Sequence, residues 1–321
     1  MKLNDIPSIG DLMAAHERIR PYIEQTPLLQ SGQLNAISGA TLFFKCENFQ
    51  KAGAFKSRGA TNALLQLDKE TMRNGVVTHS SGNHAQALAR AAALFGIKAY
   101  IVMPENAPAV KVAAVKQYGG IITFCKPTLA ARESSTEEIV TKTGAHIVHP
   151  YNDYDIIAGQ STACIELLRQ GPLPDYILCP VGGGGLLSGT LLASRYLSPA
   201  TKVIACEPEG ANDAFLSLRS GQLIPSNNPQ TIADGLLTSL GSRTWPIIKD
   251  NVHDIMTVSD EAIVHAMQLV WERMKIVIEP SSAIPVAVAL SGGSIFKNKS
   301  IAIILSGGNV DLEKLPWNKN L

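Results

Sequence analysis

The chain has 321 residues, of which 45% are hydrophobic and 17% charged, so it can bury one large core or two smaller ones and is not typical of a disordered protein. Its 28 Lys and Arg residues balance 27 Asp and Glu residues to a net charge of +1. This neutral balance offers no electrostatic attraction to nucleic acid or to an anionic membrane surface, and it favours a small-molecule partner.

The N-terminal segment and the cysteines predict a cytoplasmic protein. Residues 1–25 contain no continuous apolar stretch behind a basic start. No run of about 18 apolar residues occurs in the chain, so we expect neither secretion nor membrane insertion. The five cysteines are widely spaced and form no Cys-x-x-Cys pair, which predicts reduced, structural thiols.

Short β-branched segments alternate with helical segments along the chain. Strands are expected at residues 40–44, 75–79, 97–103, 119–124, 145–149, 175–181, 201–207 and 299–305. Apolar residues recur at intervals of three and four in segments 83–96, 107–119 and 260–275, which predicts helices. The alternation predicts an α/β fold with parallel sheets. We expect a small α/β domain over residues 75–150, inserted into a larger domain formed by residues 1–74 and 151–321.

The first segment with chemical content is NFQKAGAFKSRGATNALL, which contains Lys56. Small neighbours surround this lysine at the expected start of a helix. A partly desolvated lysine near a helix N-terminus has a lowered pKa and can provide the amine of a Schiff base. Most lysines are simply solvated, so Lys56 alone does not decide the chemistry.

A polar turn follows the predicted strand at residues 75–79. It contains Ser80, Ser81, Gly82, Asn83 and His84 at the start of a predicted helix. Backbone N–H groups at such a turn can bind a carboxylate. The alternative is that Ser81 or Asn83 only caps the helix.

Four consecutive glycines, Gly182, Gly183, Gly184 and Gly185, join a predicted strand to a helix that starts near Leu186. They expose backbone N–H groups at the positive end of the helix, which favours a phosphate group. The alternative is a tight turn without a ligand. Because no Lys-Ser or Lys-Thr pair follows, the sequence does not favour a P-loop for nucleoside triphosphates.

The same segment partly matches a dinucleotide-binding motif. Gly183 and Gly185 supply its first two glycines, Ser188 stands at the third glycine position, and Glu207 ends the next predicted strand. An NAD-dependent oxidoreductase is therefore the alternative from a different functional class.

Ser306 begins the sequence SGGN at the end of the last predicted strand. Strand ends of this kind converge on a crevice, although an ordinary turn would have the same sequence. A reactive lysine combined with a phosphate site favours pyridoxal phosphate, because this cofactor needs both.

These motifs together resemble the fold type II pyridoxal-phosphate enzymes, in particular the serine/threonine dehydratase and serine racemase group. GAFKSRGA, SSGNHAQA, GGGG and SGGN occur in the family's order, and the resemblance extends over residues 27–315. It implies a two-domain fold like that of the tryptophan synthase β subunit, with parallel and mixed sheets flanked by helices. It also implies a homodimer.

The resemblance assigns roles to individual residues. Lys56 would bind the cofactor covalently and move the Cα proton, while Phe55 and Gly235 would flank the pyridine ring. The other cofactor contacts would be Asn83 at the 3′ oxygen, Gly182, Gly183, Gly184, Gly185 and Leu186 at the phosphate, and Ser306 at the ring nitrogen. Ser80, Ser81, Gly82, Asn83, His84 and Arg132 would contact the substrate.

The reaction that the resemblance implies is elimination of water from L-serine or L-threonine, which gives a 2-oxo acid and ammonia. Ser81 matches a serine that serine racemases place opposite the lysine, where a second acid–base group permits inversion at Cα. Serine racemisation is therefore an alternative main activity.

A third activity follows from the substrate side of the resemblance. Arg132 matches an arginine that approaches an acidic substrate group in racemase-like members, which implies threo-3-hydroxyaspartate as a substrate. A solvated Arg132 is the alternative. Tyr151 stands where the animal racemases have asparagine, so their substrate contacts do not transfer directly.

The resemblance also implies a divalent cation bound by Glu207, the Ala211 carbonyl oxygen and Asp213. Oxygen ligands suit Mg²⁺, Mn²⁺ or Ca²⁺. The alternative is that Glu207 only ends a strand and Asp213 caps the following helix.

Overall fold

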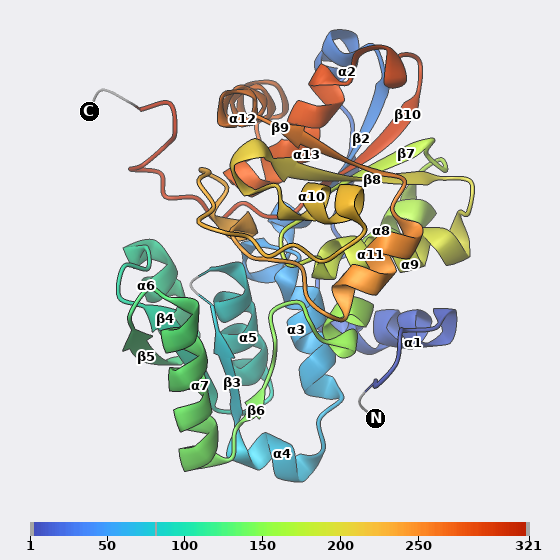
Figure 1. Cartoon of the computed structure of the whole chain (residues 1–321). Helices are drawn as coiled ribbons and strands as arrows, with labels where there is room; N and C mark the ends of the chain where they lie inside the picture. Colours follow the sequence, from blue (N-terminus) through green and yellow to red (C-terminus); the bar gives the residue numbers. More distant parts are fainter. Residues whose placement is uncertain (1–2, 81, 319–321) are drawn as a thin grey trace.

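The computed structural model describes residues 3–80 and 82–318, and two sheets organise this part of the chain (Figure 1). The larger sheet has six strands in the order β1-β2-β10-β7-β8-β9. These strands are β1 (Leu28–Leu29), β2 (Thr41–Cys46), β10 (Ser300–Leu305), β7 (Tyr176–Pro180), β8 (Lys202–Pro208) and β9 (Asp254–Val258). Neighbouring strands are parallel except β1, which is antiparallel to β2.

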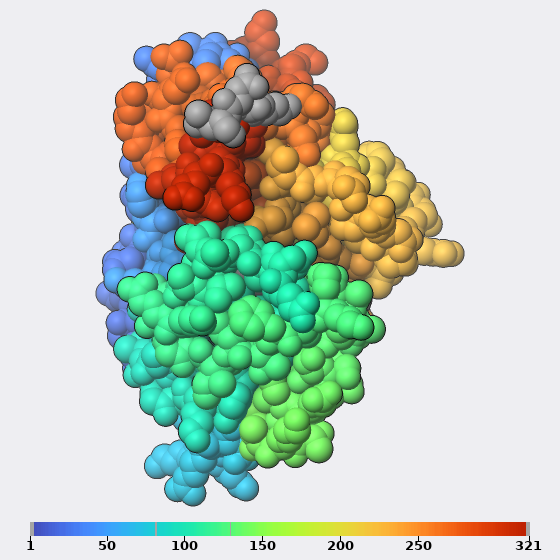
Figure 2. Space-filling model, turned by 90° about the vertical axis from the view of Figure 1, so that its left-hand side faces the viewer, coloured from blue at the N-terminus to red at the C-terminus, as the bar shows by residue number. Residues whose placement is uncertain are grey.

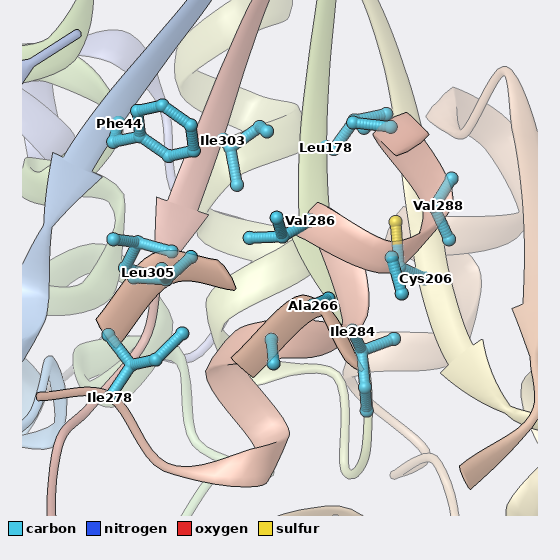
Figure 3. Close-up of a cluster of buried hydrophobic side chains, with 14 of the residues drawn as sticks. Phe44, Leu178, Cys206, Ala266, Ile278, Ile284, Val286, Val288, Ile303 and Leu305 are labelled. Carbon is cyan, nitrogen blue, oxygen red and sulfur yellow. The ribbon is translucent and has the colours of Figure 1, made fainter. Parts of the chain in front are cut away.

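Helices cover both faces of the six-stranded sheet. One face carries α1 (Ile9–Ile19), α8 (Tyr154–Gln170), α9 (Gly185–Leu197) and α11 (Thr244–Asn251). The other face carries α2 (Gly32–Ser38), α12 (Asp260–Met274) and α13 (Pro280–Ser291). Because successive strand residues point to opposite faces, Ile303 belongs to one hydrophobic cluster and Ile304 to the other. Figure 3 shows Ile303 and Leu178 on neighbouring strands facing Val286 of α13.

The smaller sheet has four parallel strands in the order β5-β4-β3-β6. Its strands are β3 (Val76–His79), β4 (Ala99–Pro104), β5 (Ile121–Cys125) and β6 (His146–Ile147). The helices around it are α3 (Lys56–Leu65), α4 (Lys69–Asn74), α5 (Asn83–Leu94), α6 (Ala109–Gln117) and α7 (Leu129–Thr143). In Figure 2 the cyan and green residues of this unit lie below the orange and red residues of the larger unit.

The predicted α/β fold class is confirmed, and all eight expected strands are present. The sequence analysis missed β1 and β9. β1 has only two residues, and β9 is a short edge strand that begins with Asp254, a residue type depleted in strands. β6 is shorter than the expected segment. The domain boundaries at residues 75 and 150 stay predictions.

The five cysteines are free and buried. Burial raises the pKa of the Cys46 and Cys164 thiols to about 12, so both stay protonated at neutral pH. None of the helices in the described ranges has both the length and the apolar composition that a bilayer-spanning helix requires.

Candidate active site

Lys56 is the first residue of α3, as predicted, and follows a tight turn. Gly53 in this turn has a φ of 68°, and a Cβ there would lie 2.5 Å from the Asn309 Oδ1 atom, so only glycine fits. The Lys56 Nζ donates a 2.7 Å hydrogen bond to the Pro150 carbonyl oxygen. Burial lowers the pKa of Lys56 to about 8, against an opposing effect of Glu279. Much of the amine is therefore neutral near pH 8.

A buried charged network lies behind this lysine, on the same helix. The Arg58 guanidinium donates to both carboxylate oxygens of Glu47 at 2.6 and 2.8 Å and to both of Glu166 at 2.7 and 2.8 Å. The Lys45 Nζ lies 2.6 Å from a Glu166 oxygen, and all four side chains are 4% exposed or less. The network joins α3 to β2, the following turn and α8. It thereby fixes the start of the helix that carries Lys56.

The four-glycine segment forms a turn between β7 and α9. In the described part of the chain, the N–H groups of Gly183, Gly184, Gly185 and Leu186 donate to no backbone carbonyl. Gly184 has a φ of 89°, which favours glycine. A Cβ on Gly183 would lie 2.3 Å from carbon atoms of the Tyr151 ring. The turn thus presents free N–H donors at the positive end of α9, an arrangement suited to a phosphate.

Ser306 follows β10 and lies beside the lysine turn. Its carbonyl oxygen accepts from the Phe55 N–H at 3.0 Å, and its hydroxyl lies 3.1 Å from that of Ser282. The Ser282 hydroxyl donates to the Gly307 carbonyl oxygen at 2.6 Å. Because a serine has one hydroxyl proton, Ser306 is the donor in the pair with Ser282.

Asn83 and Glu279 form a polar chain next to Lys56. The Asn83 Nδ2 donates to Glu279 Oε1 at 2.8 Å, and the Asn309 Nδ2 donates to Asn83 Oδ1 at 2.9 Å. Glu279 is 2% exposed, and its Oε2 has no partner among the described residues. Burial, followed by the nearby Asp234 carboxylate, raises the pKa of Glu279 to about 7.

One cavity of about 410 Å³ connects these groups. The predicted residues that line it are Phe55, Lys56, Ser80, Gly82, Asn83, His84, Arg132, Gly182, Gly183, Gly184, Gly185, Leu186, Gly235 and Ser306. The structure therefore brings together residues that are up to 251 positions apart, between Phe55 and Ser306. Ser81 lies outside the described residues.

The polar turn after β3 contributes Ser80, Gly82, Asn83 and His84 to the lining of the cavity. α5 begins at Asn83, as predicted. The Gly82 N–H donates to the Ser80 hydroxyl at 3.3 Å, and the His84 Nε2 lies 3.2 Å from the Val148 carbonyl oxygen. Burial holds the pKa of His84 well below its usual value, so this ring is neutral.

Residues from the units of both sheets line the cavity. Arg132 of α7 and His79 at the end of β3 line the cavity, and so does Tyr151. The Lys111 ammonium of α6 forms an ion pair with Asp234 of the larger unit. This ion pair connects the two units directly at the cavity.

The predicted cation ligands lie away from this cavity. The two Glu207 oxygens accept from the N–H groups of Ala214 and Phe215 at 2.9 and 2.8 Å. Glu207, a residue of β8, therefore caps the start of α10 (Asp213–Ser220). Burial raises the pKa of Glu207 to about 8 and that of Asp213 to about 6. Asp213 Oδ2 has no partner in the described ranges. No group of three His, Cys, Asp or Glu side chains suited to a metal occurs there either.

The sequence analysis missed several polar residues that line the cavity, among them the titratable Glu279, Lys111, Asp234 and His79. A signal existed for Glu279, because Pro280 marks a helix start and the preceding acid occupies the N-cap position. Lys111 and Asp234 are 123 positions apart, and nothing in the sequence pairs them.

Comparisons with known proteins agree with the predicted resemblance. A family model described as "Pyridoxal-phosphate dependent enzyme" matches residues 19–307. The beta-hydroxyaspartate dehydratase of Paracoccus denitrificans is 50% identical over 313 residues, which cover 98% of this chain and 99% of that protein. The serine racemase of Dictyostelium discoideum is 49% identical, with 96% of each chain covered.

Solved structures give the same picture. The crystal structure of a threonine deaminase from T.th. matches with a TM-score of 0.91 and 44% identity. The match covers 95% of this chain and 99% of that chain. Proteins with similar sequences or similar overall structures thus carry the names of a dehydratase, a racemase and a deaminase.

Proposed function

The chain belongs to the family of pyridoxal-phosphate-dependent enzymes, and from this premise we propose that it is a lyase acting on β-hydroxy amino acids. It eliminates water from L-serine or L-threonine to give a 2-oxo acid and ammonia. The observation that carries the proposal is that the Lys56 amine shares one cavity with the free N–H groups at the start of α9.

The residues present fit pyridoxal phosphate. Free N–H donors suit its phosphate, and an amine with a lowered pKa suits covalent attachment. The Glu279 Oε2 has no partner in the described part of the chain, so the cavity also has unused polar capacity. In this arrangement Gly182, Gly183, Gly184, Gly185 and Leu186 would hold the phosphate. Phe55 and Gly235 would flank the ring, and Asn83 and Ser306 would bind its polar edge.

When bound, pyridoxal phosphate supplies an electron sink that stabilises negative charge at the substrate Cα. Lys56 takes the Cα proton, because its lowered pKa leaves the amine neutral and basic near pH 8. Ser306 is a neutral hydroxyl and provides no negative charge to hold a proton on the ring nitrogen. Such a site favours prompt departure of the β-hydroxyl group.

Two further activities use the same site. Ser81 would provide a second acid–base group on the substrate face opposite Lys56, which supports serine racemisation. Arg132 lines the cavity and would bind a second carboxylate, which supports dehydration of threo-3-hydroxyaspartate. Relatives that are about half identical to this chain carry the names of both activities.

The oxidoreductase alternative loses its basis. Ser188 is buried within α9, and the Glu207 carboxylate accepts two N–H groups of α10 away from the cavity. Neither residue is available for a dinucleotide in the way the motif requires. The family model that matches the chain is that of pyridoxal-phosphate enzymes.

A divalent cation is part of the proposal. The unpartnered Asp213 Oδ2, the raised pKa of Glu207 and the nearby Ala211 carbonyl support it, because a cation would compensate two buried carboxyl groups. We further propose a homodimer in the cytoplasm that acts on small amino acids. These proposals rest on the family resemblance and on the composition of the chain.

Reaction of the purified holoenzyme with L-serine in D₂O and Mg²⁺ tests the activity. Pyruvate, measured by NMR, is the expected product of dehydration. Deuterated D-serine, measured by chiral chromatography, would add racemisation. Ser81→Ala should abolish D-serine formation while L-threonine dehydration continues. Absence of 2-oxo acid and of inversion with L-serine, L-threonine and 3-hydroxyaspartate would contradict the proposal.

A further inference from the structure

Tyr151 lies directly on the glycine turn. An ideal Cβ on Gly183 would lie 2.3 to 2.4 Å from three carbon atoms of the Tyr151 ring, and a Cβ on Gly185 would lie 3.0 Å from the Tyr151 Cβ. Any side chain at Gly183 would therefore displace the ring. The absence of a side chain at Gly183 serves the packing of Tyr151 as well as the exposure of N–H donors.

Two neighbours fix the orientation of this tyrosine. The His149 Nδ1 accepts from the N–H groups of Tyr151 and Asn152 at 3.3 and 2.9 Å. The His149 ring lies edge to face against the Tyr151 ring, with centroids 4.7 Å apart. Burial lowers the pKa of His149 to about 4, so this acceptor persists at neutral pH. At the other end of the ring, the Thr238 side chain lies close to the phenol.

The Arg132 guanidinium supplies positive charge on this side of the cavity, and the nearby carboxylates that act on Tyr151, those of Glu133 and Asp213, are not part of the cavity lining. Arg132 is half-buried and lines the same cavity as Tyr151 and Thr238. Its Nε donates to the Thr128 carbonyl oxygen at 3.4 Å. In residues 3–80 and 82–318 its guanidinium forms no ion pair.

The carboxyl groups that line the cavity, those of Asp234 and Glu279, lie near Lys111 instead. Asp234 forms an ion pair with Lys111, and Glu279 is close enough to both to be influenced by their charges. The cavity is therefore polarised, with its carboxyl groups near Lys111 and a free guanidinium near the Tyr151 phenol. An anionic substituent is attracted to the second of these regions.

We propose that Tyr151 determines specificity: its phenol hydroxyl, whose ring is held by packing on Gly183 and against His149, binds together with Arg132 the second carboxylate of a β-hydroxy dicarboxylic amino acid. The inference rests on the proposed function, because it concerns the substrate of that site. A guanidinium and a hydroxyl provide two kinds of donor to one carboxylate. Serine and threonine have no second carboxylate to occupy this position.

Tyr151→Phe tests this inference, because it removes the hydroxyl and keeps the ring on Gly183. The ratio of kcat/KM for 3-hydroxyaspartate to kcat/KM for L-threonine is expected to fall by about 10- to 100-fold, as for a lost hydrogen bond to a charged group. Arg132→Met should lower the same ratio. The double variant should lose less than the product of the single effects, because both residues act on one carboxylate. Cofactor loading, measured by absorbance, is expected to persist.

Tyr154→Phe is the matched control. Tyr154 also carries a phenol, but its ring faces the Arg243 guanidinium at 4.9 Å and it does not belong to the cavity lining. This variant should leave the ratio unchanged. An equal loss for both substrates in Tyr151→Phe, or no loss in the ratio, would overturn the inference.

A binding measurement separates this inference from the proposed function. Calorimetry on the holoenzyme should show that succinate binds more tightly than butyrate and that Tyr151→Phe reduces the difference. If the enzyme fails to convert any of the amino acids, the proposed function fails, while the succinate comparison still decides the role of Tyr151. If the enzyme converts L-threonine but binds succinate no better than butyrate, the inference fails alone.

Discussion

The two sides of the cavity are built in different ways. On the side of the larger sheet, a backbone hydrogen bond from the Phe55 N–H to the Ser306 carbonyl oxygen joins the lysine turn to the end of β10. The buried network around Arg58 supports the helix that carries Lys56. On the side of the smaller sheet, Arg132 and His79 are partly exposed and have few hydrogen bonds. Lys111 connects the two sides through Asp234.

This difference separates two tasks. The tightly held side has the groups that suit a phosphate and a covalent lysine, and this chemistry tolerates little displacement. The sparsely held side faces the remaining volume of the cavity, where substrates differ from one another. We therefore expect substitutions on the first side to affect all reactions and those on the second to affect the choice of substrate.

Lys56→Ala is expected to have the largest effect. Loss of the amine removes the base for the Cα proton, so turnover should fall by at least about 10² to 10⁴-fold for every substrate. Steady-state kinetics with L-serine and L-threonine measure this loss. Lys51→Ala removes a partly exposed lysine of the preceding turn and serves as the control. Retained turnover in Lys56→Ala would break the assignment of the two sides.

Arg58→Ala tests how firmly the first side is held. It leaves Glu47 and Glu166 buried with a missing partner, which should lower the free energy of unfolding by about 3 to 5 kcal/mol. The matched control is Arg219→Ala, because Arg219 and Asp254 form an exposed pair, 57% and 41% accessible, that should contribute about 0 to 1 kcal/mol. Urea unfolding measures both. Similar losses in the two variants would show that the buried network contributes no more to the free energy of unfolding than an exposed ion pair does.

The pKa of Lys56 predicts a pH dependence of the cofactor-free protein. The folded chain releases the Lys56 proton near pH 8, whereas an unfolded lysine keeps it to about 10.5. Between these values the unfolded state binds more protons, so this residue makes stability rise with pH. The free energy of unfolding of wild type minus that of Lys56→Met should rise over this window. A flat or falling difference would contradict the lowered pKa.

Removal of the proposed cation should have the smallest effect, a change in thermal stability, because its proposed ligands do not line the cavity. A cation bound only by the folded state stabilises it, so EDTA should lower Tm by a few degrees, about 2 to 4 °C per kcal/mol for a domain of this size. Asp213→Asn should be less sensitive to EDTA. No change in Tm, together with no metal by elemental analysis, would contradict the proposed cation site.

The sequence was most informative where a function depends on contiguous residues. Lys56 at a helix start, the four glycines at a strand end and Ser306 after the last strand each lie within one short segment, and each lies where its segment predicts. The expected cation ligand Glu207 had two interpretations in the sequence. In the structure Glu207 lies near the end of β8 but also caps α10, a role that the second interpretation gave to Asp213, and cation binding stays a proposal.

The substrate side could not be assembled in the same way. Its residues come from the end of β3, from α7 and from the segment after β6, and no local pattern relates them. Tyr151 was visible only as a departure from the animal racemases. Its contact with Gly183 depends on the packing of two segments that are 32 positions apart, between 151 and 183.

Reduction of the purified protein with borohydride in the presence of pyridoxal phosphate, followed by peptide mapping, tests the central claim most directly. The account predicts loss of the yellow absorbance and one cofactor adduct on the peptide that contains Lys56. An adduct on another lysine, or no adduct at saturating cofactor, would contradict it.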